Sequence, residues 1–253
     1  MTNGSAKLPR YYCSLEPFRE VFRLGVPILT YHKLGKRPRG VRVRKLYVSA
    51  DLFVQQLAEL RAAGFTTITL SQVPSALANP QQQLVLTFDD GFRNAAEHAL
   101  PVLAANKLCA IQFLIAGLLG RANEWELREG EARELLMDEA QVRDWLAAGH
   151  SIGSHSCTHP HLTQIPVAEA RREIADSKKA LEDRFGVAVE HFCYPYGEWN
   201  EAVRDLVAEA GYRTACTTEV GINCPDVSPF ALKRVFARYT PRTLKMFLDR
   251  CLR

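Results

Sequence analysis

The sequence predicts an α/β protein whose parallel strands form a deformed (β/α) barrel of about seven units in a single domain. Short apolar runs alternate with helical patterns, no linker divides the 253 residues, and polar motifs follow several of the apolar runs. A doubly wound open sheet is the alternative architecture. We expect residues 1–25 to form an N-terminal extension and residues 26–253 to form the domain itself.

The first half of the chain carries two clear strand candidates, 26–31 and 84–88, which are apolar runs of the length expected for buried strands. Between them, Ser49 is a predicted helix N-cap and Gly64 a predicted helix stop. The other elements expected here are a helix at 50–63, a β-like segment at 65–70, a helix at 95–106 and a strand at 109–115.

The second half continues the alternation after a polar stretch, 116–137, which we expect to be an insertion or a long loop. Asp138 is a predicted N-cap, and Gln141 three residues later completes a capping box. The expected helices are 138–148, 166–185, 198–210 and 241–252, and the expected strands are 150–154, 191–194, 213–217 and 232–236.

Bulk composition excludes several classes of protein. The charged and hydrophobic fractions are ordinary for a globular protein, and a net charge of +4 does not favour nucleic-acid binding. No apolar run has the length of a signal peptide or a membrane span. The cysteines lack CxxC spacing, so we expect reduced thiols and a cytoplasmic location, with the inner membrane face as a variant; they are Cys13, Cys109, Cys157, Cys193, Cys216, Cys224 and Cys251.

Positive charge is concentrated in the stretch 33–45, which contains no acidic residue. A solvated loop is the simpler interpretation of such a run. The alternative is a contact with phosphate or a peripheral contact with an anionic membrane surface. The basic residues are Lys33, Lys36, Arg37, Arg39, Arg42, Arg44 and Lys45.

Polar residues follow the predicted strands at the places where a barrel enzyme builds its site. His32 follows the first strand, Asp89 and Asp90 follow 84–88, and His155 and His159 follow 150–154. In a parallel barrel these ends share one face. Two imidazoles and one carboxylate form a common open metal site. Since adjacent residues leaving a strand face opposite ways, one aspartate can ligate while the other stays free as a base.

Each of these motifs also has a structural alternative. Asp-Asp-Gly is a frequent turn sequence. The histidine pair could be a polar loop, because Pro160 disfavours a helix through His159.

Three motifs together carry a resemblance to a known family. TFDDG at 87–91, HSCTH at 155–159 and FCYPYG at 192–197 resemble, in order and spacing, the motifs of the polysaccharide deacetylase family, also called the NodB-homology or carbohydrate esterase family 4 domain. The resemblance covers roughly residues 26–240. Tyr31-His32 is similar to the opening of a subgroup that deacetylates poly-N-acetylglucosamine.

The resemblance implies a metal-dependent hydrolase that removes N-acetyl groups from an amino sugar and releases acetate. It implies that Asp90, His155 and His159 bind a divalent metal, usually zinc and sometimes cobalt or nickel. Asp89 would be the general base for the attacking water, and the backbone N–H of Tyr196 would help to hold the oxyanion.

The sequence departs from the family pattern at two places. An arginine that pairs with the base often opens the third motif, whereas here Cys193 occupies that position. Arg234 is our candidate replacement, with a surface arginine as the alternative. The late histidine that supplies the general acid is also absent, since none follows His191. His32 is our candidate acid, with a structural histidine as the alternative.

Two other functions compete with deacetylation. A glycan-binding protein could keep the fold without turnover. GHSIG at 149–153 fits the G-x-S-x-G pattern of serine hydrolases around Ser151, but the order of strand and helix around it is reversed.

The implied partner is an N-acetylated glycan or a lipid-linked amino sugar, for which the basic loop would suit a lipid diphosphate. Trp125, Tyr194, Tyr196 and Trp199 are candidates for stacking on sugar rings, with core packing as the alternative.

Overall fold

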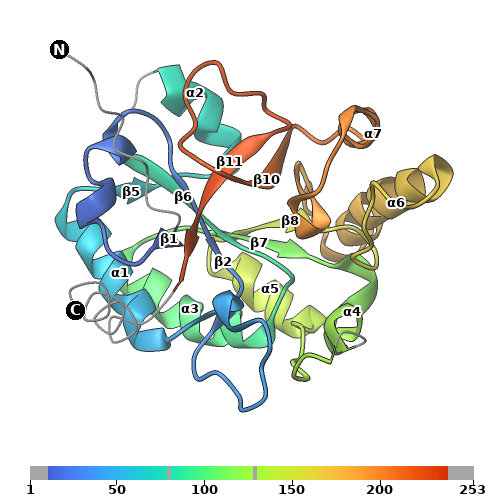
Figure 1. Ribbon diagram of the computed structural model, residues 1–253, viewed down its shortest axis with the longest axis horizontal. Coiled ribbons are helices and arrows are strands. Elements are labelled where there is room, and N and C mark those ends of the chain that lie inside the picture. The colour runs from blue at the N-terminus through green and yellow to red at the C-terminus, as the bar shows by residue number, and fades with distance from the viewer. Residues whose placement is uncertain (1–10, 79–80, 128–129, 239–253) are drawn as a thin grey trace, which may run out of the picture.

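Seven parallel strands close into a barrel in the computed structural model, which describes residues 11–78, 81–127 and 130–238. The order around the ring is β2-β6-β7-β8-β9-β10-β11, and β11 pairs with β2 to close it (Figure 1). The predicted barrel of about seven units in one domain is therefore confirmed, and the open sheet is excluded. The ring strands are β2 (Ile28–Tyr31), β6 (Gln83–Phe88), β7 (Ile111–Leu114), β8 (Ser151–Ser154), β9 (His191–Cys193), β10 (Thr214–Val220) and β11 (Leu232–Ala237).

Helices surround the ring of strands (Figure 1). Ser49 caps the first of them by accepting a hydrogen bond from the Leu52 backbone N–H, and the capping box of Asp138 and Gln141 is present. The predicted helix 241–252 lies outside the described residues. The described α-helices are α1 (Ala50–Ala62), α2 (Val73–Ala78), α3 (Arg93–Asn106), α4 (Glu124–Leu127), α5 (Glu139–Ala147), α6 (Val167–Phe185) and α7 (Glu201–Glu209).

Two segments differ from the sequence-based expectation. The 65–70 segment supplies only β5 (Thr66–Thr67), and the unpredicted helix α2 follows it. Pro74 lies in the first turn of α2, where its missing N–H would have no partner in any case. The polar stretch 116–137 contains the short helix α4, which lies beside the pocket described below. A two-stranded sheet of β3 (Lys33–Leu34) and β4 (Tyr47–Val48) brackets the basic loop.

The described part of residues 1–25 packs against the barrel. β1 (Tyr11–Tyr12) pairs with β11, and Phe18 and Phe22 belong to the main hydrophobic core.

No helix among the described residues is long and apolar enough to cross a membrane. The six cysteines among the described residues of the whole chain are free thiols.

Strand alternation explains how the barrel positions polar groups at its mouth. Ile28 and Val85 belong to the small cluster that also holds Ile111 and Phe113, whereas their neighbours Leu29 and Leu86 pack in the larger cluster. Because successive side chains face opposite sides of a sheet, the small cluster marks the inside of the ring. His32 follows Ile28, and Asp89 follows Val85, by an even number of residues along the same strand direction. Their side chains are therefore expected on the inside of the ring as well, at its carboxyl end.

Candidate metal centre and active site

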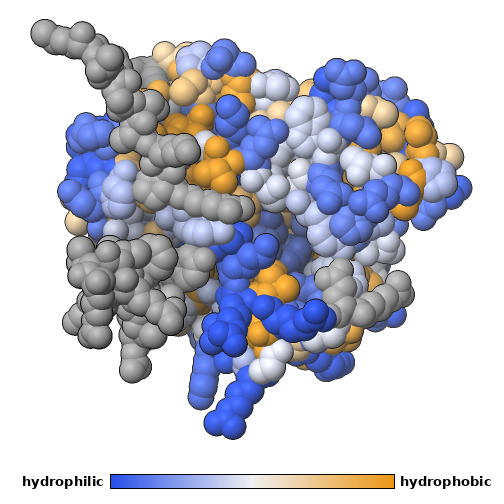
Figure 2. Space-filling view, viewed as in Figure 1, coloured by the Kyte–Doolittle hydropathy of each residue, from blue (hydrophilic) through white to orange (hydrophobic). Residues whose placement is uncertain are grey.

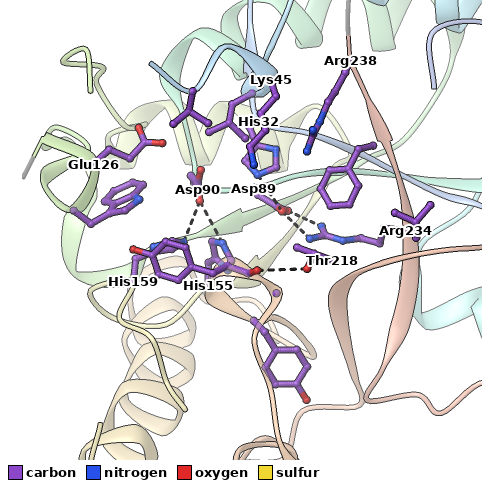
Figure 3. Close-up of a pocket in the computed structure, with 18 of the residues that line it drawn as sticks. His32, Lys45, Asp89, Asp90, Glu126, His155, His159, Thr218, Arg234 and Arg238 are labelled. Atoms are coloured by element: carbon purple, nitrogen blue, oxygen red, sulfur yellow. Dashed lines mark hydrogen bonds and ion pairs between the residues drawn. The ribbon is translucent and has the colours of Figure 1, made fainter. Parts of the chain in front are cut away.

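The carboxyl ends of the strands surround a pocket of about 430 Å³ (Figure 3). This volume lies within the range of small-molecule sites, about 300–1,000 Å³. All the site residues predicted from the sequence line this one pocket, although they come from five separate parts of the chain: His32, Asp89, Asp90, His155, His159, Tyr196 and Arg234.

Asp90, His155 and His159 converge on one point. The Nε2 atoms of His155 and His159 lie 3.3 and 3.5 Å from Oδ1 of Asp90, and all three side chains are buried. Two ligand atoms bound to one zinc ion at tetrahedral angles are about 3.3 Å apart, since each lies about 2.0–2.1 Å from the metal. The three residues therefore fit a divalent metal and can hold it with one carboxylate oxygen and two imidazole nitrogens.

Hydrogen bonds from the surrounding chain orient the two imidazoles. Nδ1 of His155 donates to the Cys193 carbonyl oxygen at 2.6 Å, which leaves Nε2 directed at the metal point. His159 adopts a left-handed backbone conformation, with φ of 64°, and its N–H donates to the Ser156 hydroxyl. Asp90 is also left-handed, with φ of 69°. Such conformations are costly for residues other than glycine and often occur at functional sites.

Glu173 of α6 fixes the loop between the two histidines. One carboxylate oxygen accepts from the backbone N–H groups of Cys157 and Thr158, each at 2.9 Å, and the other accepts from the Thr158 hydroxyl at 2.7 Å. Nothing in the sequence connects Glu173 with the motif, because the contact depends on how α6 packs against the loop.

The electrostatics of the ligand set suit metal binding. Burial, with His155 adding to it, lowers the pKa of His159 to about 3, so its imidazole is neutral as ligation requires. Burial would lower the pKa of His155 too, but Cys193 and Asp90 raise it well above the ordinary value. Burial would raise the pKa of Asp90, and its contacts with the histidines lower it instead. A metal must therefore displace a proton from the Asp90–His155 pair.

Asp89, which follows the same strand as Asp90, is paired with Arg234 through both of its carboxylate oxygens. Nη1 and Nη2 of Arg234 donate to Oδ1 and Oδ2 of Asp89, each at 2.8 Å, and the arginine is 0% exposed. Burial would raise the pKa of Asp89, but Arg234 and His32 hold it below the ordinary value, so the carboxylate stays ionised. Nη2 of Arg234 also lies 3.2 Å from Sγ of Cys193. The guanidinium from β11 thus contacts the residue in the position where the family often has its arginine.

His32 is the third group beside Asp89. Its Nε2 lies 3.6 Å from Oδ2 of Asp89 at the wall of the pocket. Burial holds the pKa of His32 below its ordinary value, although Asp89 and Asp90 raise it. The imidazole is therefore neutral near pH 7 and can accept a proton before giving one up.

The third motif forms a tight turn under the pocket. Tyr196 is left-handed, with φ of 59°, and Gly197 follows with φ of 72°. A Cβ on Gly197 would lie 2.1 Å from the Thr218 hydroxyl, so only glycine fits there. The Thr218 hydroxyl donates to the Tyr196 carbonyl, and the His161 ring stacks on the Tyr196 ring at 3.8 Å. The carbonyl and the ring of Tyr196 are therefore both held by neighbouring side chains.

Helix α4 contributes two residues that the motifs do not include. The Trp125 ring lies 4.9 Å from that of His159, and Glu126 lines the same wall (Figure 3). Nζ of Lys33 donates to Glu126 at 2.6 Å, and both side chains are buried. Lys33 was predicted to belong to the solvated basic loop, but it is buried against Glu126 instead. Burial raises the pKa of Glu126, and Lys33 opposes that rise.

The remaining sequence candidates lie elsewhere or play other parts. Ser151 begins β8, at the amino end of the ring, whereas the site lies at the carboxyl ends. A nucleophile elbow needs a serine between a strand and a following helix, so Ser151 is not placed as one. Tyr194 lines the pocket, while Trp199 packs against the core and stacks on Tyr194.

Known proteins resemble this chain in sequence. It is 28% identical over 214 residues to YxkH of Bacillus subtilis, a predicted polysaccharide deacetylase, with 83% of this chain and 70% of that protein covered. It is 23% identical to the poly-β-1,6-N-acetyl-D-glucosamine N-deacetylase of Staphylococcus aureus, over 82% of this chain and 77% of that one. The chitooligosaccharide deacetylase of a Bradyrhizobium strain is 30% identical, over about half of each chain (51% and 53%).

Solved structures share the fold. The Streptococcus pyogenes deacetylase PplD, in complex with acetate, superposes with a TM-score of 0.74 at 26% identity, over 87% of this chain and 96% of that one. IcaB from Ammonifex degensii superposes with a TM-score of 0.73 at 25% identity, over 89% and 96%.

The sequence model of the polysaccharide deacetylase family matches residues 76–215, which is more than half of the chain. That span contains Asp89, Asp90, His155, His159 and Tyr196, while His32 and Arg234 reach the same pocket from outside it. A closed parallel barrel with these motifs at its mouth, matched by sequence and by structure, places the chain in the polysaccharide deacetylase family.

Proposed function

We propose that this deacetylase is a metal-dependent hydrolase that removes N-acetyl groups from an amino sugar of a glycan or a lipid-linked precursor. One observation carries the proposal. Asp90, His155 and His159 converge on one point, while the adjacent Asp89 is held separately and ionised by Arg234. A protein that only bound glycan would gain nothing from a free base beside a metal-ligand set.

The reaction replaces the amide C–N bond by a C–O bond from water. Lewis-acid activation of the acetyl carbonyl and of the attacking water is the chemistry that a divalent metal supplies here, with zinc expected and cobalt or nickel as substitutes. Asp89 accepts a proton from the water, and Arg234 keeps that carboxylate oriented. The Tyr196 backbone N–H donates to the oxyanion that forms on the carbonyl oxygen.

The nitrogen of the sugar needs a proton to leave as an amine. His32 is placed for this step, because its imidazole lines the pocket beside Asp89. The neutral imidazole takes from Asp89 the proton that came from water and gives it to the leaving nitrogen, which returns both groups to their starting states. The products are acetate and an amino sugar, and water supplies all the atoms that are added.

Acetate release tests this function. The substrates are N-acetylglucosamine oligomers and a lipid-linked N-acetylated amino sugar, assayed before chelation, after chelation and after re-addition of zinc or cobalt. We expect chelation to abolish acetate release and metal to restore it. If protein that still holds metal releases no acetate from any of these substrates, the proposal is wrong and a glycan-binding role replaces it.

A further inference from the structure

A buried carboxylate that belongs to none of the three motifs lines the wall of the pocket. Glu126 of α4 is buried, and Figure 3 shows it on the far side of Asp90 from Asp89 and Arg234. Its hydrogen-bond partners in the described part of the chain are Lys33 and Asn123, so it contacts neither the base nor the metal ligands in this way. The reaction steps proposed above leave Glu126 without a role.

The two oxygens of this carboxylate have different surroundings. Oε2 accepts from Nζ of Lys33 at 2.6 Å and from Nδ2 of Asn123 at 2.7 Å. Among the residues that the structure describes, no group donates a hydrogen bond to Oε1. The Glu126 side chain keeps 9% of its surface exposed, at the wall of the pocket. Oε1 is therefore a hydrogen-bond acceptor that is open to a ligand.

The partners of Oε2 hold the carboxylate in one place. Lys33 is fully buried, and its Nζ lies 4.3 Å from the centre of the Phe92 ring, so the ammonium group is enclosed. Asn123 is buried as well. Its amide nitrogen also donates to the Ala132 carbonyl, and its amide oxygen accepts from the Glu134 N–H. An acceptor that is already fixed loses little freedom when a ligand reaches it.

The surroundings of Oε1 fit a neutral donor on a sugar. Trp125 lines the same wall, with its ring 4.9 Å from that of His159, and an aromatic surface can pack against the C–H groups of a sugar ring. The Lys33 ammonium already balances the charge of the Glu126 carboxylate, so this wall does not call for a cation. Hydroxyl groups are the neutral donors at the edge of a sugar ring, and a carboxylate accepts short, strong hydrogen bonds from them.

We propose that Glu126 is a specificity-determining residue whose Oε1 accepts a hydrogen bond from one hydroxyl group of the acetamido sugar. This inference rests on the proposed function, since the sugar occupies the same pocket. It adds a requirement for the substrate. The recognised hydroxyl must be present and unsubstituted, because an ether or ester at that oxygen has no proton to donate.

The test removes the hydroxyl groups of the substrate one at a time. Acetate release by the metal-loaded protein is measured for an N-acetylglucosamine disaccharide and for its monodeoxy forms, each of which lacks one hydroxyl. We expect kcat/KM to fall about 10- to 100-fold for the form that lacks the recognised hydroxyl, because hydrogen bonds to charged groups are strong. Equal kcat/KM for the parent and every deoxy form would overturn the proposal and leave the deacetylase activity intact.

A paired variant assigns the effect to Glu126. Lys33→Met combined with Glu126→Met removes the acceptor without leaving a buried charge unpaired, a change that proteins often tolerate. This variant should no longer distinguish the parent from the deoxy form that wild type disfavours. The control, Arg121→Met with Glu124→Met, removes a more exposed ion pair of the same segment and should still distinguish them.

A second variant keeps the charge. Glu126→Asp still pairs with Lys33 but withdraws the carboxylate by one methylene, so it should reduce the same discrimination even if the paired variant fails to fold. Discrimination that is unchanged in the Glu126 variants, or that is lost equally in the Arg121 and Glu124 control, would overturn the proposal.

Binding separates this proposal from the proposed function. Calorimetry on metal-loaded Asp89→Asn protein should show weaker binding of the disfavoured deoxy form than of the parent disaccharide, and Glu126→Asp added to that variant should reduce the difference. If this difference is measured but wild type deacetylates no sugar, the hydroxyl site stands and the activity fails. If the parent is deacetylated but all forms bind equally, the hydroxyl site fails and the activity stands. A parent disaccharide that neither binds nor reacts would contradict both.

Discussion

The two ends of the barrel hold similar side chains but use them differently. At the amino end, His191 is hydrogen-bonded by the hydroxyls of Ser71 and Thr214, each at 2.9 Å, so its ring nitrogens are satisfied locally. At the carboxyl end, His155 and His159 direct nitrogens at a point that they share with Asp90. A single histidine in a barrel therefore does not indicate a functional site, whereas several ligand atoms that converge on one point indicate a metal site.

Backbone strain is concentrated at the mouth of the barrel. Four of the described non-glycine residues with positive φ lie at the mouth, in or beside the metal motifs: Asp90, Ser156, His159 and Tyr196. The strain is maintained by local contacts such as the Ser156 hydroxyl and the Glu173 carboxylate. The mouth is thus built for placement of groups.

The largest expected effect comes from removing the shared ligand. Asp90→Asn should abolish stable metal binding and lower acetate release by about 10³-fold or more, because the metal supplies several kcal/mol of transition-state stabilisation. Metal content and turnover are measured on the same sample. The matched control at the other end, His191→Asn, should keep both. Loss of metal in the control would show that the two ends are not functionally distinct.

Arg234→Met should affect both stability and catalysis. It leaves Asp89 as a buried, unpaired carboxylate, which costs about 3–5 kcal/mol of unfolding free energy. Arg234 lowers the pKa of Asp89, so its loss raises that pKa and moves the acid limb of the kcat profile to higher pH. Denaturant unfolding and a pH–rate profile measure the two effects. An unmoved acid limb would contradict the assignment of Asp89 as the base.

The pH dependence of stability gives a further check on the same pair. Because the folded-state pKa of Asp89 is depressed, the stabilisation is present above the unfolded-state pKa of about 3.9 and is lost as the pH falls through the folded-state pKa. Wild-type protein should show this loss at acidic pH, and the Arg234→Met variant should show much less of it.

Glu173→Gln should weaken metal binding without touching the metal. The amide oxygen can still accept from the backbone N–H groups of Cys157 and Thr158, but the carboxylate charge that strengthens these hydrogen bonds is lost, and the amide NH2 cannot accept from the Thr158 hydroxyl. We expect metal affinity to fall about 10–100-fold, as for other groups that orient ligands. Asp176→Asn, an exposed change on the same helix, should leave the affinity unchanged. Equal affinities in the two variants would remove Glu173 from the site.

Protons should compete with the metal at the mouth. The pKa of His155 is raised in the metal-free protein, so metal binding displaces a proton and affinity falls as pH falls. The loss approaches about tenfold per pH unit for one displaced proton. Calorimetry in buffers of different ionisation enthalpy counts the protons released. Affinity that is independent of pH between 6 and 8 would show that His155 is already neutral.

The smallest expected effect concerns the basic loop. We still predict peripheral contact with an anionic membrane surface and a cytoplasmic location, and exposed Lys36, Arg37, Arg39, Arg42 and Arg44 are the basis for the contact. Each of the four arginines that is neutralised should weaken binding to anionic vesicles by about 1 kcal/mol or less, which is about fivefold or less per charge. Figure 2 shows hydrophilic side chains projecting at the lower edge, where Figure 1 places this loop. Unchanged vesicle binding would remove the membrane interpretation.

The sequence predicted most of what depends on local pattern. Strand alternation and the placement of motifs after apolar runs were enough to predict that His32, Asp89 and His155 lie in one pocket, as the structure shows. The contact of Arg234 with Asp89 was expected only from the departure at Cys193, and the structure shows why the exchange works, since the guanidinium lies beside that sulfur.

What the sequence did not predict depends on packing between distant segments. Lys33 looked like the first residue of a basic loop, but helix α4 brings Glu126 against it and buries both. The role of Glu173 depends on how α6 packs against the loop that carries the two histidines, which no local spacing records. Helix α2 was missed because Pro74 and its short length resemble a loop.

The most direct test of the account separates the two adjacent aspartates. Metal content and acetate release are measured together for Asp89→Asn, with wild type and Asp90→Asn beside it. If Asp89 is the base and Asp90 the ligand, Asp89→Asn protein keeps its metal and loses turnover, while Asp90→Asn loses both. Turnover that survives in Asp89→Asn, or metal that is lost from it as completely as from Asp90→Asn, would contradict the division of labour that the pocket geometry supports.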